Sequence, residues 1–151
     1  MADVKLNRFE LARYTMLRAQ VVQIDEDIRE IEDELAELEQ YNVKIGPVYT
    51  GMPVGNEKID KIAEFIIQLD KDRNRLNTRL SVLLIERNYN MGEMYAIRAA
   101  VNKIQNVQLR EIIKSHFFEG QSVSDIAQKL FITKSAVRKR LHRYFNLARN
   151  G

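Results

Sequence analysis

Apolar residues recur along the first part of the chain in alternating steps of four and three. The series consists of Leu17, Val21, Ile24, Ile28, Ile31, Leu35 and Leu38. This spacing places one apolar stripe along a helix and is typical of a coiled-coil seam. Asp and Glu residues fill most of the positions between these residues. The outer faces of this helix are therefore expected to be acidic and solvated.

A second apolar stripe follows a break that is rich in glycine and proline. The break covers residues 43–56 and contains Gly46, Pro47, Gly51, Pro53 and Gly55. These residue types interrupt helices or form turns. The second stripe consists of Ile59, Ile62, Ile66, Leu69, Leu76, Leu80 and Leu83, with Arg73 in the missing seam position. Two long helices joined by one loop are predicted to fold back as an antiparallel hairpin.

The register of the second stripe continues past Gly92. It passes the polar residues Arg87 and Asn90 and resumes at Met94, Ile97, Val101 and Ile104. A continuous second helix to about Gln105 is therefore one interpretation. A kink or break at Gly92 is the other, because glycine in a helix interior costs about 1 kcal/mol relative to alanine. We place the domain boundary here, with a hairpin for oligomerisation or partner docking at 1–92 and a second domain at 93–151.

Shorter helical segments are predicted in this second domain. Asn106 is a plausible cap for a helix from Val107 to Phe118. Its apolar side is formed by Leu109, Ile112, Ile113 and Phe117. A segment with Glu119, Gly120 and Gln121 ends this helix.

Two more short helices complete the pattern. Ser122 is a cap for the first of them, whose apolar residues are Ile126, Ala127 and Leu130. Phe131 and Ile132 form a tight turn, and Thr133 caps the last helix, from Lys134 to about Ala148. The inward side of the last helix consists of Val137, Leu141, Tyr144, Phe145 and Ala148. Two such helices around a tight turn form a helix-turn-helix pattern, so the expected fold is all-α.

The last helix carries a cationic surface opposite Val137 and Leu141. No acidic residue occurs from Lys134 to Gly151. Arg and Lys on a helix in the major groove read guanine edges, while flanking cations and capped helix starts hold phosphates. The candidate DNA-binding residues are Ser122, Thr133, Lys134, Ser135, Arg138, Lys139, Arg140, His142 and Arg143.

The distribution of charge supports double-stranded DNA as the partner. Residues 106–151 carry nine Lys and Arg against three Asp and Glu, whereas the preceding residues carry fifteen against eighteen. A basic end on an acidic body is expected where one end touches a polyanion and the other touches protein or water.

Residues Ile97 to Ala148 resemble a known family of DNA-binding modules. The stretches Phe117–Gly120, Ser124–Leu130 and Ser135–Leu141 look like region 4 of the sigma factors. More narrowly, they resemble phage and prophage late-gene regulators of the ArpU and RinA type and a related small streptococcal phage family. The segment Met52-Pro53-Val54-Gly55-Asn56, together with Asp60, is also similar to a segment of these regulators.

The resemblance implies a prophage transcription activator in the cytoplasm of a bacterial host. Two residues depart from the usual pattern. Phe131 stands where many helix-turn-helix sequences have a glycine, and Arg140 stands where a second apolar residue is common. Two registers, one residue apart, therefore remain for the residues that face the groove in the second half of the last helix.

Several kinds of site are not expected in this chain. There are no cysteines, so disulfides and thiolate sites are excluded. The two histidines, His116 and His142, lie on different predicted helices without a ligand triplet. The spacing of Gly46, Gly51 and Gly55 fits no phosphate-loop motif. We expect no cofactor, no metal and no enzymatic activity. The longest apolar run, Val82 to Ile85, is too short for a membrane span, so a soluble protein is expected.

Three functions remain open at this level. The leading hypothesis is sequence-specific DNA binding that activates phage late transcription, with the hairpin used for self-association or for docking on RNA polymerase. The second is DNA packaging, because small terminase subunits also join a helix-turn-helix to helical oligomerisation segments. The third is a coiled-coil adaptor that binds no DNA. Seam residues can pair within one hairpin or between chains, and we expect a homodimer whose fragment 93–151 folds and binds duplex weakly.

Overall fold

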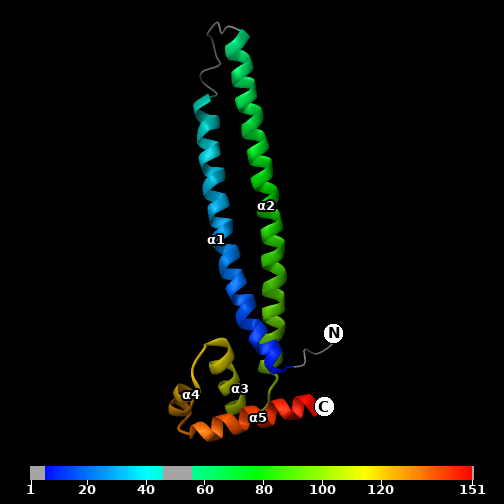
Figure 1. Cartoon of the computed structure of the whole chain (residues 1–151), viewed down its shortest axis with the longest axis vertical. Coiled ribbons are helices and arrows are strands. Elements are labelled where there is room, and N and C mark those ends of the chain that lie inside the picture. Colours follow the sequence, from blue (N-terminus) through cyan, green and yellow to red (C-terminus); the bar gives the residue numbers. More distant parts are fainter. Residues whose placement is uncertain (1–5, 46–55, 151) are drawn as a thin grey trace. The chain divides into compact units, whose positions relative to one another are not determined.

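The described part of the chain is helical throughout. The computed structural model describes the backbone of residues 6–45 and 56–150, and the side chains of 6–41 and 59–146. Within these ranges the order of elements is α1 (Arg8–Ile45), α2 (Asn56–Asn102), α3 (Val107–Ile113), η2 (Lys114–Phe118), α4 (Val123–Leu130) and α5 (Lys134–Asn150). No strand occurs in the described residues, and the all-α prediction is confirmed (Figure 1). Most of the predicted loop, including Met52 to Gly55 of the phage-like segment, lies outside the described residues.

The chain divides into two compact units that do not follow the predicted boundary. Unit 1 consists of Met1–Val21 together with Tyr89–Gly151, and unit 2 consists of Val22–Asn88. Unit 1 therefore contains the short helices, the first turns of α1 and the last turns of α2. The division into a hairpin at residues 1–92 and a DNA-binding domain at 93–151 stays a prediction.

Unit 2 is an antiparallel helical hairpin with an apolar seam. The second half of α1 packs against the first part of α2, and Figure 1 shows the two helices side by side. Ile24 and Ile31 of α1 are buried with Leu76 and Leu83 of α2. The remaining seam residues packed against them are Ile28, Leu35, Leu38 and Leu80. The predicted hairpin is thus confirmed, because apolar residues spaced by three and four meet along one line.

Some predicted seam positions of unit 2 are exposed or polar. Ile59 and Ile66 are exposed, so the continuous apolar stripe predicted for α2 is wrong at these positions. Arg73 is half-buried in the seam, where its Nη1 lies 3.4 Å from Oδ1 of Asp70. Arg87 interrupts the apolar pattern because it pairs with Asp25 across the hairpin, with Nε and Oδ1 2.6 Å apart.

Helix α2 runs without a break through Gly92. It extends from Asn56 to Asn102 as one helix, so the interpretation with a break at Gly92 is wrong. Asn90, one turn before Met94, is buried, and its Nδ2 donates a hydrogen bond of 3.3 Å to Oε1 of Gln20. A polar pair of this kind at a seam position fixes the register of two helices.

The core of unit 1 draws on every helix of the chain. The most deeply buried side chains are Leu11 of α1, Ile97 and Val101 of α2, Ile112 and Ile113 of α3, Ile126 of α4 and Val137 of α5. Each of these side chains loses its contact with water only because the other helices cover it. The first turns of α1 therefore belong to the same hydrophobic core as the short C-terminal helices. None of the described helices has the length and apolar character needed to cross a membrane.

Candidate nucleic-acid interface

Helices α3, α4 and α5 each begin at a side-chain cap. Oδ1 of Asn106 accepts a hydrogen bond of 3.1 Å from the backbone N–H of Leu109 at the start of α3. Oγ of Ser122 accepts one of 3.1 Å from Asp125 in α4. Thr133 caps α5, since its Oγ1 accepts from the N–H of Ala136 at 3.1 Å. All three caps were predicted, and each satisfies an N–H group that the helix itself leaves without a partner.

A π-helical turn follows α3 where the sequence predicted a regular helix to Phe118. In this turn, η2, the N–H of Glu119 donates to the carbonyl oxygen of Lys114 at 3.1 Å. The wider turn shifts the following side chains relative to an α-helix. Phe118 is consequently buried, and Phe117, predicted on the apolar side, is half-buried and packs against the core.

Helix α1 holds the end of η2 in place. Oγ1 of Thr15 donates to the carbonyl oxygen of Phe117 at 3.0 Å, and Nη1 of Arg18 donates to that of Phe118 at 2.5 Å. The ring of Tyr14 packs on the ring of Phe118 with centroids 4.1 Å apart. These contacts satisfy carbonyl groups at the end of a helical segment, which otherwise lack intrahelical partners. The end of η2, which precedes α4 and α5 in the chain, is thus held by side chains from the first turns of α1.

The turn between α4 and α5 contains a strained aromatic residue. Phe131 follows α4 in the left-handed region, with φ 58° and ψ 40°, and its side chain is 95% exposed. Glycine is the usual residue where a helix ends in this conformation, because a Cβ atom makes it unfavourable by about 1–2 kcal/mol. The unusual phenylalanine therefore occupies the expected glycine position of the turn.

Helix α5 has a buried side and an exposed basic side. Val137 and Leu141 are buried, as predicted, and Tyr144 and Phe145 are half-buried. Burial raises the pKa of the Tyr144 hydroxyl, which therefore stays neutral near pH 7. The candidate residues Lys134, Ser135, Arg138, Lys139, His142 and Arg143 are exposed. Arg140 is half-buried, because it lies beside the covered side of the helix rather than on the exposed side.

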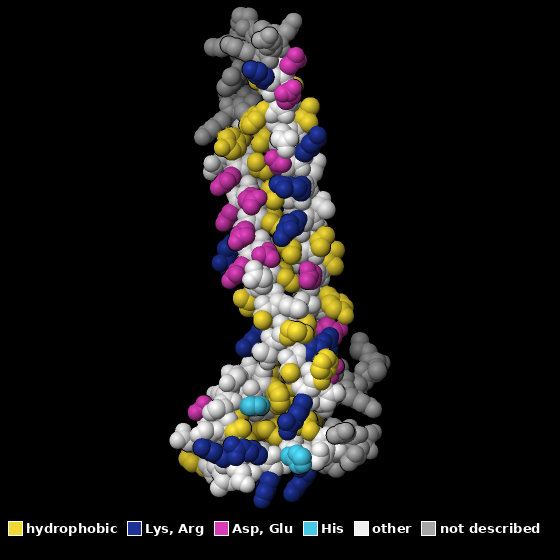
Figure 2. Space-filling view, in the orientation of Figure 1, with side chains coloured by type: hydrophobic (Ala, Val, Ile, Leu, Met, Phe, Trp, Pro, Cys, Tyr) yellow, Lys and Arg dark blue, Asp and Glu magenta, His cyan; other side chains and the backbone are white. Residues whose placement is uncertain are grey.

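The exposed side of α5 is not neutralised by neighbouring acids. None of the ion pairs among the described side chains involves a residue of α5. The imidazole of His142 accepts a hydrogen bond of 2.9 Å from the amide of Asn146 at its Nε2. Lys and Arg side chains gather over this part of unit 1 in Figure 2, whereas Asp and Glu follow α1 within unit 2. Such a surface attracts polyanions.

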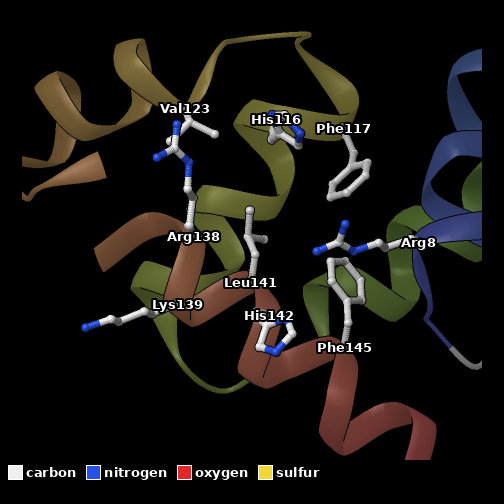
Figure 3. A pocket seen from close by; sticks show the side chains of 9 residues that line it. All are labelled: Arg8, His116, Phe117, Val123, Arg138, Lys139, Leu141, His142 and Phe145. Atoms are coloured by element: carbon white, nitrogen blue, oxygen red, sulfur yellow. The ribbon is translucent and has the colours of Figure 1, made fainter. Parts of the chain in front are cut away.

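A hollow opens beside the basic side of α5. It has a volume of about 610 Å³ and is shown in Figure 3. Arg138, Lys139 and His142 of α5 line it together with Arg8 and His116. Its apolar lining consists of Phe117, Val123, Leu141 and Phe145. Within the described part of the chain, no group of three His, Asp or Glu residues could hold a metal ion.

The structure brings most of the predicted contact residues together. Lys134, Arg138, Lys139 and Arg143 share the exposed side of α5, whereas Arg140 lies beside its covered side. Ser122 and Thr133 lie at the starts of α4 and α5. Sequence reasoning did not find Arg8 or His116 as part of this surface. Arg8 lies more than a hundred residues before α5, and no local pattern signals such proximity. Contact of each of these residues with DNA stays a prediction.

Residues 106–144 match the family model described as sigma-70, region 4. The matched segment covers α3, η2, α4 and most of α5, and α5 carries the exposed basic residues. No curated protein and no solved structure matches the chain significantly. The chain thus carries a helix-turn-helix module similar to region 4 of sigma-70 factors, which supports DNA binding by residues 106–144.

Proposed function

We propose that this protein is a sequence-specific regulator of transcription that activates the late genes of a phage or prophage. The observation that carries the proposal is the acid-free, exposed basic side of α5 within a module similar to sigma-70 region 4. In this proposal α5 lies in the major groove. Arg138 and Lys139 contact base edges there, and Lys134, Arg140 and Arg143 contact phosphates.

The protein acts in this proposal by binding and not by catalysis. Its partners are double-stranded DNA and RNA polymerase, and it needs no cofactor. The acidic hairpin of unit 2 makes a homodimer, so that two modules engage half-sites about one helical turn apart. A hairpin that docks on polymerase instead would leave the protein monomeric. Light scattering on the full chain measures its oligomeric state, and footprinting measures the length of DNA that it protects. A dimer with a long footprint supports the first arrangement, and a monomer supports the second.

Footprinting on the DNA that surrounds the protein's own gene is the test of the proposal. A footprint at a promoter, together with increased transcription from that promoter, is the expected result. A footprint confined to a DNA-packaging site would replace the proposal with a role in packaging. The absence of any footprint at near-physiological salt would leave a helical adaptor that binds no DNA.

Single substitutions on α5 test how the module reads its site. Arg138→Ala and Lys139→Ala are each expected to weaken binding to the footprinted site by roughly 5- to 150-fold. This range corresponds to the 1–3 kcal/mol of a good bidentate base contact. Arg79→Ala is the matched control, because Arg79 is an exposed arginine of unit 2. Unchanged binding by both α5 variants would show that α5 is not the recognition helix.

A further inference from the structure

The hollow beside α5 is lined by positive charge from two distant parts of the chain. Arg138 and Lys139 belong to α5, and Arg8 is the first residue of α1. No Asp or Glu side chain lines the hollow. The same cavity therefore borders both the proposed base-reading residues and a cation outside the helix-turn-helix. A polyanion that enters this hollow meets Arg8 as well as Arg138 and Lys139.

The side chain of Arg8 is placed by stacking and not by an ion pair. Its Cζ lies 5.1 Å from the centre of the Phe145 ring, and Figure 3 shows the guanidinium directed toward that ring. In the described part of the chain, no ion pair involves Arg8. The nearby Glu10 pairs instead with Arg13, at 3.0 Å. Stacking on a ring leaves the N–H groups at the edge of the guanidinium free to donate.

The position of Arg8 in α1 is unfavourable for a cation. It is the first residue of the helix, and the N-terminal end of a helix carries a partial positive charge. A basic residue in the first turn destabilises a helix for this reason. An anion bound beside Arg8 removes this repulsion, because it interacts favourably with both the guanidinium and the helix end.

We propose that Arg8 binds a phosphate of the DNA backbone, so that the DNA interface extends from α5 onto α1. The inference rests on the proposed function, because it takes duplex DNA as the polyanion that meets α5. The arginine contributes to affinity and to the orientation of the module on the duplex, and it does not distinguish one sequence from another. The DNA-binding surface is thus assembled from residues at both ends of unit 1.

The test compares the salt dependence of duplex binding for the full chain and for Arg8→Gln. Binding to the footprinted duplex and to a scrambled duplex is measured by fluorescence anisotropy across a series of salt concentrations. The slope of log K against log salt is negative, and loss of one phosphate contact is expected to reduce its magnitude by about 0.9. Both duplexes are expected to be weakened by the same factor, because a phosphate contact carries no sequence information.

Two control variants separate charge from structure. Arg8→Lys keeps the charge and is expected to keep the slope of the parent chain. Arg29→Gln removes an exposed arginine of α1 that lies in unit 2, and is also expected to leave the slope unchanged. Thermal unfolding followed by circular dichroism checks that Arg8→Gln remains folded. If Arg8→Lys or Arg29→Gln reduces the magnitude of the salt slope as much as Arg8→Gln does, the phosphate contact of Arg8 is refuted.

The outcomes also separate this inference from the proposed function. If the parent chain binds neither duplex, the proposed function fails. If the parent binds and Arg8→Gln has the same affinity and slope, the inference about Arg8 alone is wrong. Titration with inorganic phosphate and with ATP completes the test. Binding of either one that is lost in Arg8→Gln, while the slope for the duplex is unchanged, would show a site for a free anion and overturn the role in DNA binding.

Discussion

Replacement of Leu11 by alanine tests whether the start of α1 is part of the DNA-binding unit. The side chain of Leu11 is 0% exposed and lies in the core of unit 1. Truncation of a buried leucine to alanine costs about 2–5 kcal/mol, because apolar contacts are lost and a cavity remains. The free energy of unfolding of a whole domain is about 5–15 kcal/mol. We therefore expect Leu11→Ala to remove a large share of the stability of α4 and α5.

Native-state hydrogen exchange, followed by mass spectrometry on peptides from α3, α4 and α5, measures this effect. Amides that exchange only when the unit opens report the free energy of that opening. A loss of 2–5 kcal/mol speeds their exchange by roughly 30- to 4,000-fold, since 1.4 kcal/mol is a factor of ten. Phe9→Ala is the matched control. Phe9 lies two residues earlier and is 73% exposed, so its loss is expected to change the stability by less than about 0.5 kcal/mol.

Equal exchange in α4 and α5 for Leu11→Ala and for the parent chain would refute this reasoning. The fragment 93–151 provides a second test. It lacks all of the core residues that α1 and the segment before it supply, which are Leu6, Leu11, Tyr14, Leu17 and Val21. We expect its amides to be less protected than in the full chain and its binding to duplex DNA to be weaker. A fragment as protected as the full chain would show that the boundary at Gly92 delimits an independent domain.

Further substitutions test the details of the module. Val137→Asp places an unpaired charge at a fully buried site and is expected to abolish the cooperative unfolding of unit 1 in circular dichroism; an unchanged transition would contradict the packing of α5. Phe131→Gly is expected to raise the free energy of unfolding by up to about 1 kcal/mol, because the relief of left-handed strain exceeds the added chain entropy. A lower melting temperature would argue against strain at Phe131. Ser122→Ala is expected to cost about 1 kcal/mol and to speed the exchange of the Asp125 amide, and the prediction fails if that exchange is unchanged.

Local signals account for the features that the sequence predicted well. The caps Asn106, Ser122 and Thr133 each bond to an N–H three residues later, so the neighbouring sequence is sufficient to identify them. The seam of unit 2 was predictable for the same reason, since its period is a property of one helix at a time. Burial of Val137 and Leu141 followed from the amphipathic pattern of α5.

Tertiary contacts account for the features that were missed. The π-helical turn η2 depends on carbonyl groups that Thr15 and Arg18 satisfy from about a hundred residues away. No pattern around Phe117 and Phe118 carries that information, and the burial of Phe118 was therefore not predicted. Arg8 was missed for a similar reason. Its nearest aromatic partner, Phe145, lies at the other end of the chain.

The division of unit 1 between both ends of the chain affects the order of events during synthesis. Residues 22–88 leave the ribosome before residues 89–151, and the contacts within this hairpin connect segments that are already complete. The hairpin is therefore able to form first. The segment 6–21 emerges earlier still, but the members of its core in α3, α4 and α5 are translated after the hairpin. A chain that stops before η2 lacks the Phe118 ring that packs on Tyr14, and one that stops before α5 lacks Val137 and Leu141 of the same core, so DNA-binding competence arises only after α5 has been made.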